Sequence, residues 1–322
     1  MPSEMFSPAQ TAAALPYLAL AREIELLLHD STVQVPPRLV QALHGGGSLF
    51  VMPAADSRVA ITKLISFVAS NSARGLPTIQ GDIVVFDVAT GQRLCLLDGP
   101  TVTARRTAAV SLLAAQHLAP RRQHADPGPM LIVGAGVQGR AHLEAFHAGL
   151  GVQEVGIASR SPGSALALVQ HAQSLGMRAF AVEDPNAVLA DFSWVVSATP
   201  AQAVALTASP RADAFVAAVG AFTPRMVEWS AEVCQTLART GSLVVDTRDA
   251  DYEAGDLLQA GVAVHALPTL KDVLVQSHLG CQRSSPLGHG SGPVFFKSCG
   301  WAGWDLAAAR CVLALTGRTV QA

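Results

Sequence analysis

The chain has 322 residues, which is long enough for two domains and too long for a single comfortable core. Half of the residues are hydrophobic and 14% are charged, a balance typical of a buried parallel sheet and a substantial subunit interface. The net charge of −2 and the lack of a basic stripe with interleaved aromatic residues argue against a nucleic-acid partner.

The sequence favours neither export nor insertion in a membrane. The first twenty residues lack a basic start, Pro16 interrupts their apolar stretch, and no apolar span of about 18 residues occurs elsewhere. There is no HExxH motif or tight His/Cys cluster, so we expect no metal site. The odd number of cysteines and the lack of CxxC spacing favour reduced thiols in the cytoplasm. The five cysteines are Cys95, Cys234, Cys281, Cys299 and Cys311.

The first 120 residues predict a mainly antiparallel sheet. Residues 48–54, 59–70 and 82–99 are apolar runs joined by turns rich in glycine and aspartate, and DVATGQ at 87–92 is typical of a hairpin turn. A helix over residues 103–119 should follow. We expect the last helix, Trp304–Gly317, to fold back onto this first domain.

Beyond residue 128 the pattern alternates strand and helix, which predicts a doubly wound parallel sheet. The polar linker Gln123–Pro129, with two prolines, marks the boundary. We therefore predict an α/β fold in which residues 123–300 form a Rossmann domain, and residues 1–122 plus 301–322 form a smaller α+β domain. The expected strands are Met130–Val133, Val152–Ala158, Arg178–Val182, Ser193–Ala198, Ala214–Val219 and Ser242–Asp246, with helices such as Gly163–Leu175 and Glu228–Arg239 between them.

Residues 131–139, LIVGAGVQG, combine a strand, a tight turn and a helix start. Gly134 would allow the sharp turn, Gly136 would let the backbone approach a pyrophosphate, and Gly139 would let the helix pack against the strand. A GxGxxG spacing alone is weak evidence, but here the right strand precedes it and the right helix follows it. We therefore favour a dinucleotide over the alternative, a glycine-rich turn without a ligand.

The end of the second strand of this domain distinguishes between the two nicotinamide cofactors. NAD enzymes usually place an acid there to accept from the ribose 2′-hydroxyl. This chain has Ser159, Arg160 and Ser161 instead, and an arginine flanked by hydroxyls suits a 2′-phosphate. We expect NADP(H) to be the preferred cofactor, with NAD(H) also accepted.

Lys63 interrupts an apolar pattern. Strand alternation places it on the same face as Ile61 and Ile65, where an unpaired ammonium costs several kcal/mol. One interpretation is an edge-strand lysine that extends its amine to water. We favour the other, a pocket lysine that binds a carboxylate or handles a proton.

Three arginines are further candidates. Arg105 and Arg106 stand at the start of a predicted helix, where positive charge opposes the helix dipole unless an anion binds there. A cofactor phosphate or a substrate carboxylate would be such an anion, and a solvated pair is the alternative. Arg38, after two prolines, could hold a carboxylate, although by itself it is better explained as a surface arginine.

With Lys63, Arg106 and the glycine turn together, the chain resembles the ornithine cyclodeaminase/mu-crystallin family. This resemblance implies a homodimer, with the first domain and the last helix forming the dimerisation and substrate-binding unit. The matching stretches run nearly end to end: VPPRL, FVMPA, KLISF, GLPTIQGDIVVFD, LLDGPTVTARRTAA, LIVGAGVQGRAHLEAF, VSATP, VGAFTPRMVEW, EAGD and FKSCGWAGWDLAAA.

The resemblance also implies roles for individual residues. Arg38 and Lys63 match positions that hold the substrate carboxylate, with Lys63 beside the reacting carbon. Arg106 matches an arginine near the cofactor phosphates and the substrate. Positions that match nucleotide contacts are Thr78, Ala135, Gly136, Val137, Gln138, Ser159, Arg160, Thr199, Val219 and Gly220.

One position departs from the cyclodeaminases. They carry an aspartate, the acid/base for the amino-acid side chain, where this chain has Phe222. This difference argues against ornithine cyclisation. The sequence GAFTP instead resembles the branch of delta-1-pyrroline-2-carboxylate reductases, which also accept the six-membered piperideine homologue. A phenylalanine would pack well against the CH₂ groups of such a ring.

We therefore expect NAD(P)H-dependent reduction of a cyclic ketimine carboxylate, giving L-proline, or L-pipecolate from the larger ring. The expected protein is a cytoplasmic homodimer that binds a small cyclic imino acid and neither nucleic acid nor membrane. The alternatives are a lyase of the ornithine cyclodeaminase type with recycled NAD, an alanine or opine-type dehydrogenase, and a non-catalytic binding protein.

Overall fold

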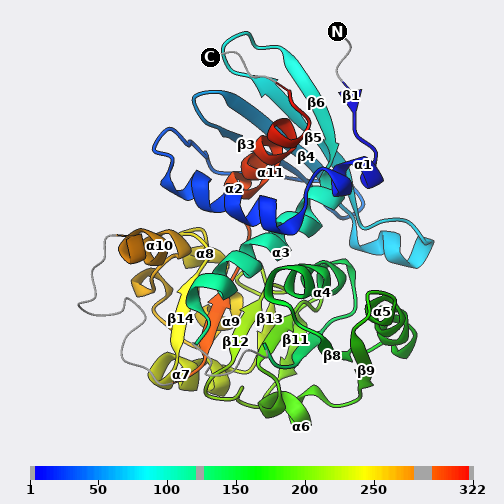
Figure 1. The fold of residues 1–322 in the computed structure, drawn as a ribbon, viewed down its shortest axis with the longest axis vertical. Coiled ribbons are helices and arrows are strands. Elements are labelled where there is room, and N and C mark those ends of the chain that lie inside the picture. The colour runs from blue at the N-terminus through cyan, green and yellow to red at the C-terminus, as the bar shows by residue number, and fades with distance from the viewer. Residues whose placement is uncertain (1–3, 121–126, 279–291, 319–322) are drawn as a thin grey trace. The chain divides into compact units, whose positions relative to one another are not determined.

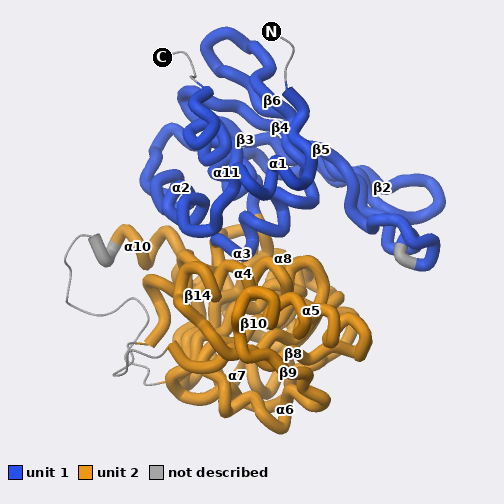
Figure 2. Tube along the Cα trace, turned by 45° about the vertical axis from the view of Figure 1, so that its right-hand side comes forward, with its two compact units in different colours: residues 1–109, 301–322 blue, residues 110–300 orange. Residues whose placement is uncertain are grey.

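The computed structural model describes residues 4–120, 127–278 and 292–318. The chain divides into two compact units, coloured separately in Figure 2: unit 1 is Met1–Ala109 with Trp301–Ala322, and unit 2 is Val110–Gly300. The division lies within helix α3, Gly99–Leu118. The expected domain boundary between residues 122 and 123 lies outside the described residues.

Unit 1 contains a six-stranded sheet in the order β1-β6-β5-β4-β3-β2 (Figure 1). Strands β2 to β6 pair antiparallel, and β1 adds to β6 in parallel. This confirms the predicted antiparallel sheet, with the expected hairpin turn between β5 and β6. The strands are β1 Glu4–Met5, β2 Leu39–Ala42, β3 Ser48–Ala55, β4 Val59–Phe67, β5 Ile79–Asp87 and β6 Arg93–Asp98.

The last helix, α11 (Ala302–Leu315), packs against helix α2, Tyr17–His29, and against β3 and β4, as expected. Side chains of β4 alternate accordingly: those at 59, 61, 63 and 65 are buried, whereas the intervening ones are partly or fully exposed. One face of the sheet is therefore covered. The remaining short helices of this unit are α1 Pro8–Ala13 and the 3₁₀ turn η1 Ala69–Arg74.

Unit 2 contains a seven-stranded parallel sheet in the order β14-β15-β12-β10-β7-β8-β9. All residues of β7, β10, β12, β14 and β15 are buried, which explains why apolar residues predominate in these strands. The predicted doubly wound sheet is confirmed. Its strands are β7 Met130–Val133, β8 Glu154–Ala158, β9 Arg178–Val182, β10 Trp194–Ser197, β12 Phe215–Ala218, β14 Ser242–Val245 and β15 Val294–Lys297.

Two details of unit 2 differ from the sequence prediction. Strand β15 lies between β12 and β14 and was not predicted, because its four residues, VFFK, are too few to show a periodicity. The helix expected to begin at Glu228 begins at Ala231, because Glu228 lies in strand β13 (Val227–Trp229), which pairs with β11 (Gln202–Leu206). Ser230 caps that helix by accepting from the backbone N–H of Val233.

The helices of unit 2 connect these strands. Within the described ranges, no helix of either unit is both long enough and apolar enough to cross a bilayer. The helical segments after α3 are α4 Val137–Leu150, α5 Pro162–Ser174, α6 Pro185–Val188, η2 Leu189–Asp191, α7 Ala231–Thr240, α8 Ala250–Glu253, α9 Gly255–Gln259, η3 Val264–Ala266 and α10 Leu270–His278.

Candidate active site

The glycine turn between β7 and α4 excludes side chains at two of its positions. Gly134 has a φ of +116°, and a Cβ there would lie 2.4 Å from the carbonyl oxygen of Ala198. A Cβ on Gly139 would lie 2.0 Å from the carbonyl oxygen of Gly134. Backbone atoms therefore pack against both glycines, as a sharp turn and a close strand–helix contact require.

Gly136 is open instead. It is the N-cap of the 14-residue helix α4, no side chain caps that helix end, and a Cβ added there would meet nothing within 4 Å. The neighbouring Val137 is 71% exposed. Helix N–H groups beside open space form a cradle that fits a pyrophosphate. The turn also follows β7, where the strand order reverses, so the residues present fit a dinucleotide.

The segment after β8 carries no carboxylate. Ser161 caps helix α5 by accepting from the backbone N–H of Ser164 at 3.3 Å, and Ser159 Oγ accepts from the N–H of Ser161. Arg160 is exposed, and among the described residues its side chain has no ion-pair or hydrogen-bond partner. The arginine is thus available to an anionic group.

Three other predicted nucleotide contacts, Thr199, Val219 and Gly220, lie in the loops after β10 and β12. We call residues 198–201 the β10 loop and residues 219–226 the β12 loop. The backbone N–H groups of Thr199 and Gly220, one in each loop, donate to the same carboxylate, that of Glu228. Val219 is buried, whereas Phe222 of the β12 loop is 40% exposed. Thr78 lies in unit 1, where its carbonyl oxygen accepts from the N–H of Val68 at 2.9 Å.

Lys63 lies in unit 1 on an internal strand, so the edge-strand interpretation is wrong. Its side chain is 1% exposed, and Nζ lies 3.1 Å and 3.3 Å from the two carboxylate oxygens of Asp305, on helix α11. Burial lowers the pKa of Lys63 to about 8, although Asp305 acts in the opposite direction. The ammonium can therefore lose or regain its proton close to neutral pH.

The adjacent arginines have different roles. Arg106 is 6% exposed, and its Nε lies 3.3 Å from Oδ1 of Asp305. Arg105 instead donates from Nε to the carbonyl oxygen of Leu15 at 2.7 Å, and its guanidinium lies 4.0 Å from the centre of the Tyr17 ring. Arg105 therefore anchors the start of α2. Helix α3 begins at Gly99, so the expectation that Arg105 and Arg106 stand at the start of a helix is wrong.

Arg38 completes a positively charged cluster in unit 1. It is half-buried, its guanidinium lies 6.0 Å from the centre of the Phe50 ring, and its charge, like that of Arg106, lowers the pKa of Lys63. We call Lys63, Arg106, Arg38 and Asp305 the cationic cluster. Lys63 and Arg106 share the single carboxylate of Asp305, which leaves one positive charge between them and suits a ligand that carries a carboxylate.

Asp305 was not predicted from the sequence, although a signal was present. It stands in the first turn of a helix whose residues from 302 to 309 are all buried, and it has no exposed surface. The reasoning that identified Lys63, a charge on an apolar face, would have identified Asp305 as well. A second buried carboxylate, Glu228, was assigned to a helix and therefore also missed.

Comparison with known proteins places this geometry in context. A model of the family described as "Ornithine cyclodeaminase/mu-crystallin family" matches residues 11–315. The Delta(1)-pyrroline-2-carboxylate reductase 1 of Burkholderia multivorans is 36% identical over 314 residues, covering 95% of this chain and 94% of that protein. The Delta(1)-pyrroline-2-carboxylate/Delta(1)-piperideine-2-carboxylate reductase of Azospirillum brasilense is 36% identical over 313 residues, covering 96% of this chain and 94% of that protein.

A solved structure shows the same fold. The Thermococcus litoralis Delta(1)-pyrroline-2-carboxylate reductase, in complex with NADH and L-proline, superposes with a TM-score of 0.81 at 22% identity. The match covers 98% of this chain and 97% of that one. The likeness therefore extends over both units of the chain.

Proposed function

The chain belongs to the ornithine cyclodeaminase/mu-crystallin family, and from that premise we propose that it is an NAD(P)H-dependent oxidoreductase acting on CH–NH groups. Its substrate is a cyclic ketimine carboxylate. Delta-1-pyrroline-2-carboxylate would give L-proline, and its six-membered homologue would give L-pipecolate. Both relatives described above are named for reductases of this kind, and this chain covers nearly their whole length.

The observation that carries the proposal is the excess positive charge of the cationic cluster. A ring carboxylate would pair with Lys63 and the guanidinium groups of Arg106 and Arg38, since Lys63 and Arg106 share the one carboxylate of Asp305 and keep one positive charge in excess. Carbon C2 of the substrate bears this carboxylate. Holding the carboxylate therefore fixes the position of the carbon that is reduced.

The chemistry needs one hydride and one proton. A reduced nicotinamide, when bound, supplies the hydride. C2 accepts it, the C=N π electrons move to the ring nitrogen, and the protonated imine becomes a secondary amine. A protonated imine is the better acceptor, and Lys63, whose pKa is lowered to about 8 mainly by burial, can keep a proton available at Nζ near neutral pH. Both carboxylate oxygens of Asp305 accept from that ammonium and so orient it.

The preferred cofactor in this proposal is NADP(H), with NAD(H) also accepted. The support is local: Arg160 is exposed and unpaired among the described residues, and no acid stands at 158–161 to accept from a ribose 2′-hydroxyl. A 2′-phosphate would find the arginine and the hydroxyl of Ser159. Gly134, Ala135, Gly136, Val137, Gln138 and Gly139 would hold the pyrophosphate, and Ser161 would serve mainly as the cap of α5.

We further propose a homodimer formed through the uncovered face of the unit 1 sheet. Leu64, 45% exposed, lies opposite Val51 in the antiparallel register, and Val84 and Phe86 lie on the same partly exposed face of β5. Four half-exposed apolar side chains on one sheet face are typical of an interface.

A cytoplasmic location fits the described cysteines, which are free and buried, while Cys281 lies outside the described residues.

One experiment separates this function from its rivals. NADPH oxidation is followed with pyrroline-2-carboxylate, piperideine-2-carboxylate, pyruvate plus ammonia, and ornithine, each at equal concentration. The proposal expects kcat/KM to be greatest for a cyclic ketimine. Ammonia release from ornithine without net cofactor change would establish a lyase, and turnover restricted to pyruvate plus ammonia would establish an alanine dehydrogenase.

A further inference from the structure

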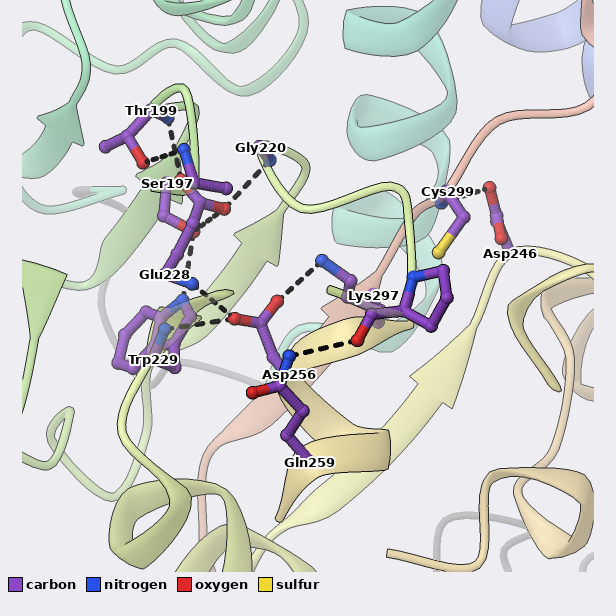
Figure 3. A network of polar contacts seen from close by, with 12 residues as sticks. Ser197, Thr199, Gly220, Glu228, Trp229, Asp246, Asp256, Gln259, Lys297 and Cys299 are labelled. Carbon is purple, nitrogen blue, oxygen red and sulfur yellow. Dashed lines mark hydrogen bonds and ion pairs between the residues drawn. The ribbon is translucent and has the colours of Figure 1, made fainter. Parts of the chain in front are cut away.

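Unit 2 contains a buried network that the proposed reaction does not use (Figure 3). At its centre is Glu228, on β13, which has no exposed surface. Its Oε1 accepts from the backbone N–H of Thr199 at 2.7 Å, and its Oε2 accepts from the backbone N–H of Gly220 at 2.8 Å and from Ser197 Oγ at 3.0 Å. One carboxylate thus joins the ends of two neighbouring strands, β10 and β12.

The carboxylate of Glu228 is held in place by further buried groups. The backbone N–H of Glu228 donates to Oδ1 of Asp256, whose Oδ2 accepts from Nζ of Lys297 at 2.7 Å. Ser197 Oγ accepts from Nε1 of Trp229 at 2.9 Å, which directs the hydroxyl proton of Ser197 toward Glu228. Each of these side chains is at most 1% exposed.

Burying this much charge is costly. The pKa of Glu228 is raised, mainly by burial and further by the nearby Asp256, although Lys297 and the hydrogen bonds from Thr199 act in the opposite direction. The backbone N–H groups of Thr199 and Gly220 and the hydroxyl of Ser197 all donate to the Glu228 carboxylate, an arrangement suited to its ionised form. Stability alone does not call for such a cluster, because well-packed apolar residues often serve as well. Its location at the carboxyl ends of the strands indicates a role at the cofactor.

The loops joined by Glu228 also contact the glycine turn. A Cβ on Gly134 would lie 2.4 Å from the carbonyl oxygen of Ala198, in the β10 loop. A Cβ on Gly220, in the β12 loop, would lie 2.3 Å from Oε1 of Glu228 and 2.5 Å from the carbonyl oxygen of Thr199. The glycine turn, the β10 loop and the β12 loop therefore pack backbone against backbone.

The β10 loop is strained as well. Ala201 is 2% exposed and has a φ of +53°, a conformation that costs a residue with a side chain about 1 kcal/mol or more. Its N–H donates to Oγ1 of Thr199 at 3.1 Å, and its carbonyl oxygen accepts from the N–H of Val227, the residue before Glu228. Such a conformation persists only where the surroundings hold it, and such positions cluster at ligand sites.

In an open parallel sheet a dinucleotide lies across the carboxyl ends of the strands at the point where the strand order reverses, here between β7 and β10. The adenosine half then lies over β7 and β8, and the nicotinamide half over β10 and β12. We propose that Glu228 is a positioning residue that holds the β10 and β12 loops in the arrangement that the nicotinamide half requires. This inference rests on the proposed use of a nicotinamide dinucleotide.

The test compares two ligands. NADPH carries both halves of the cofactor, whereas 2′-phospho-ADP-ribose lacks the nicotinamide. Dissociation constants are measured by calorimetry for the wild type and for Glu228→Gln, whose amide keeps the size but presents an N–H to a backbone N–H. We expect the Kd for NADPH to rise about tenfold or more, as for the loss of one charge-assisted hydrogen bond. The Kd for 2′-phospho-ADP-ribose should stay within about twofold.

Asp246→Asn is the matched control. Asp246 is also buried in unit 2, and its Oδ2 accepts from Ser298 Oγ and from the N–H groups of Cys299 and Gly300, none of which belongs to either loop (Figure 3). This variant should leave the ratio of the two dissociation constants unchanged. Equal weakening of both ligands by Glu228→Gln, or no weakening of either, would overturn the proposal.

Two provisions keep the outcome decisive. If Glu228→Gln does not fold, the same titrations on Glu228→Asp apply, because that variant keeps the charge but withdraws the oxygens by one methylene. If the wild type prefers NADH, then NADH and ADP-ribose replace the phosphorylated pair. Neither titration contains an imine, so the test does not depend on the substrate. A protein that binds the cofactor but reduces no cyclic ketimine would refute the proposed function. The ratio of the two dissociation constants would still decide the role of Glu228.

Discussion

Replacing Lys63 with methionine should abolish most of the activity without weakening the fold. Methionine keeps much of the volume of the buried side chain but removes the ammonium that faces Asp305 at 3.1 Å. Loss of a charge-assisted bond to the substrate carboxylate and of a positioned proton source should together lower kcat/KM by about 100-fold or more. That factor corresponds to about 2.7 kcal/mol of transition-state stabilisation.

Lys63→Met should lower kcat/KM but should not lower the free energy of unfolding. Burial, its largest cause, lowers the pKa of Lys63 from 10.5 to about 8, so the folded state disfavours the charged form. Between pH 8 and 10.5 the unfolded chain holds a proton that the folded chain has lost, and stability rises with pH. A shift of this size corresponds to about 3 kcal/mol at pH 7. Lys63→Met should therefore be at least as stable as the wild type at pH 7, and this advantage should shrink by pH 10.5.

Both parts can be measured on one pair of proteins. Steady-state kinetics with pyrroline-2-carboxylate gives kcat/KM, and urea unfolding at pH 7 and pH 10 gives the free energy of unfolding. A Lys63→Met enzyme within about tenfold of wild-type kcat/KM would remove Lys63 from the mechanism. A variant that lost activity and whose free energy of unfolding also fell by several kcal/mol would show instead that Lys63 mainly holds α11 on the sheet.

Three further predictions follow from the same contacts. The Kd of pyrrole-2-carboxylate, a planar anion without a titrating imine, should rise above pH about 8 as Lys63 loses its proton, and a flat profile from pH 6 to 10 would contradict this assignment. Arg106→Ala should raise the substrate KM about tenfold or more, whereas Arg105→Ala should lower Tm with little change in KM, because Arg105 bonds to the start of α2; similar KM values in the two variants would refute this division. Arg160→Ala should raise the KM for NADPH about tenfold and leave that for NADH nearly unchanged, and an equal effect on both cofactors would exclude contact with a 2′-phosphate.

Local patterns in the sequence were sufficient for much of the fold. Alternation along residues 59–67 placed Lys63 on the covered face of β4, because a strand turns successive side chains to opposite faces. The spacing of Gly134 and Gly139 predicted two close backbone contacts, which the structure confirms. In each case the information lies within ten residues of the site.

The unpredicted features depend on partners that are distant in the chain. Asp305 meets Lys63 across 242 residues, and Glu228 meets Thr199 across 29, so no local periodicity indicates either pair. Strands β13 and β15 are three and four residues long, and each is defined by the neighbouring strand with which it pairs. Asp305, Glu228 and Lys297 share one local signal, a charged residue within an apolar segment. Only Lys63 was interpreted from that signal.

The central claim is that this chain directs a hydride to C2 of a cyclic ketimine carboxylate. Incubation with pyrroline-2-carboxylate and NADPH deuterated at C4 of the nicotinamide, tried separately on each face, tests this claim most directly. Mass spectrometry and NMR of the product should show L-proline with one deuterium at the α-carbon from one of the two labels. The claim would be contradicted if the proline carried no deuterium from either label. It would also be contradicted if no proline formed and NADPH was not consumed.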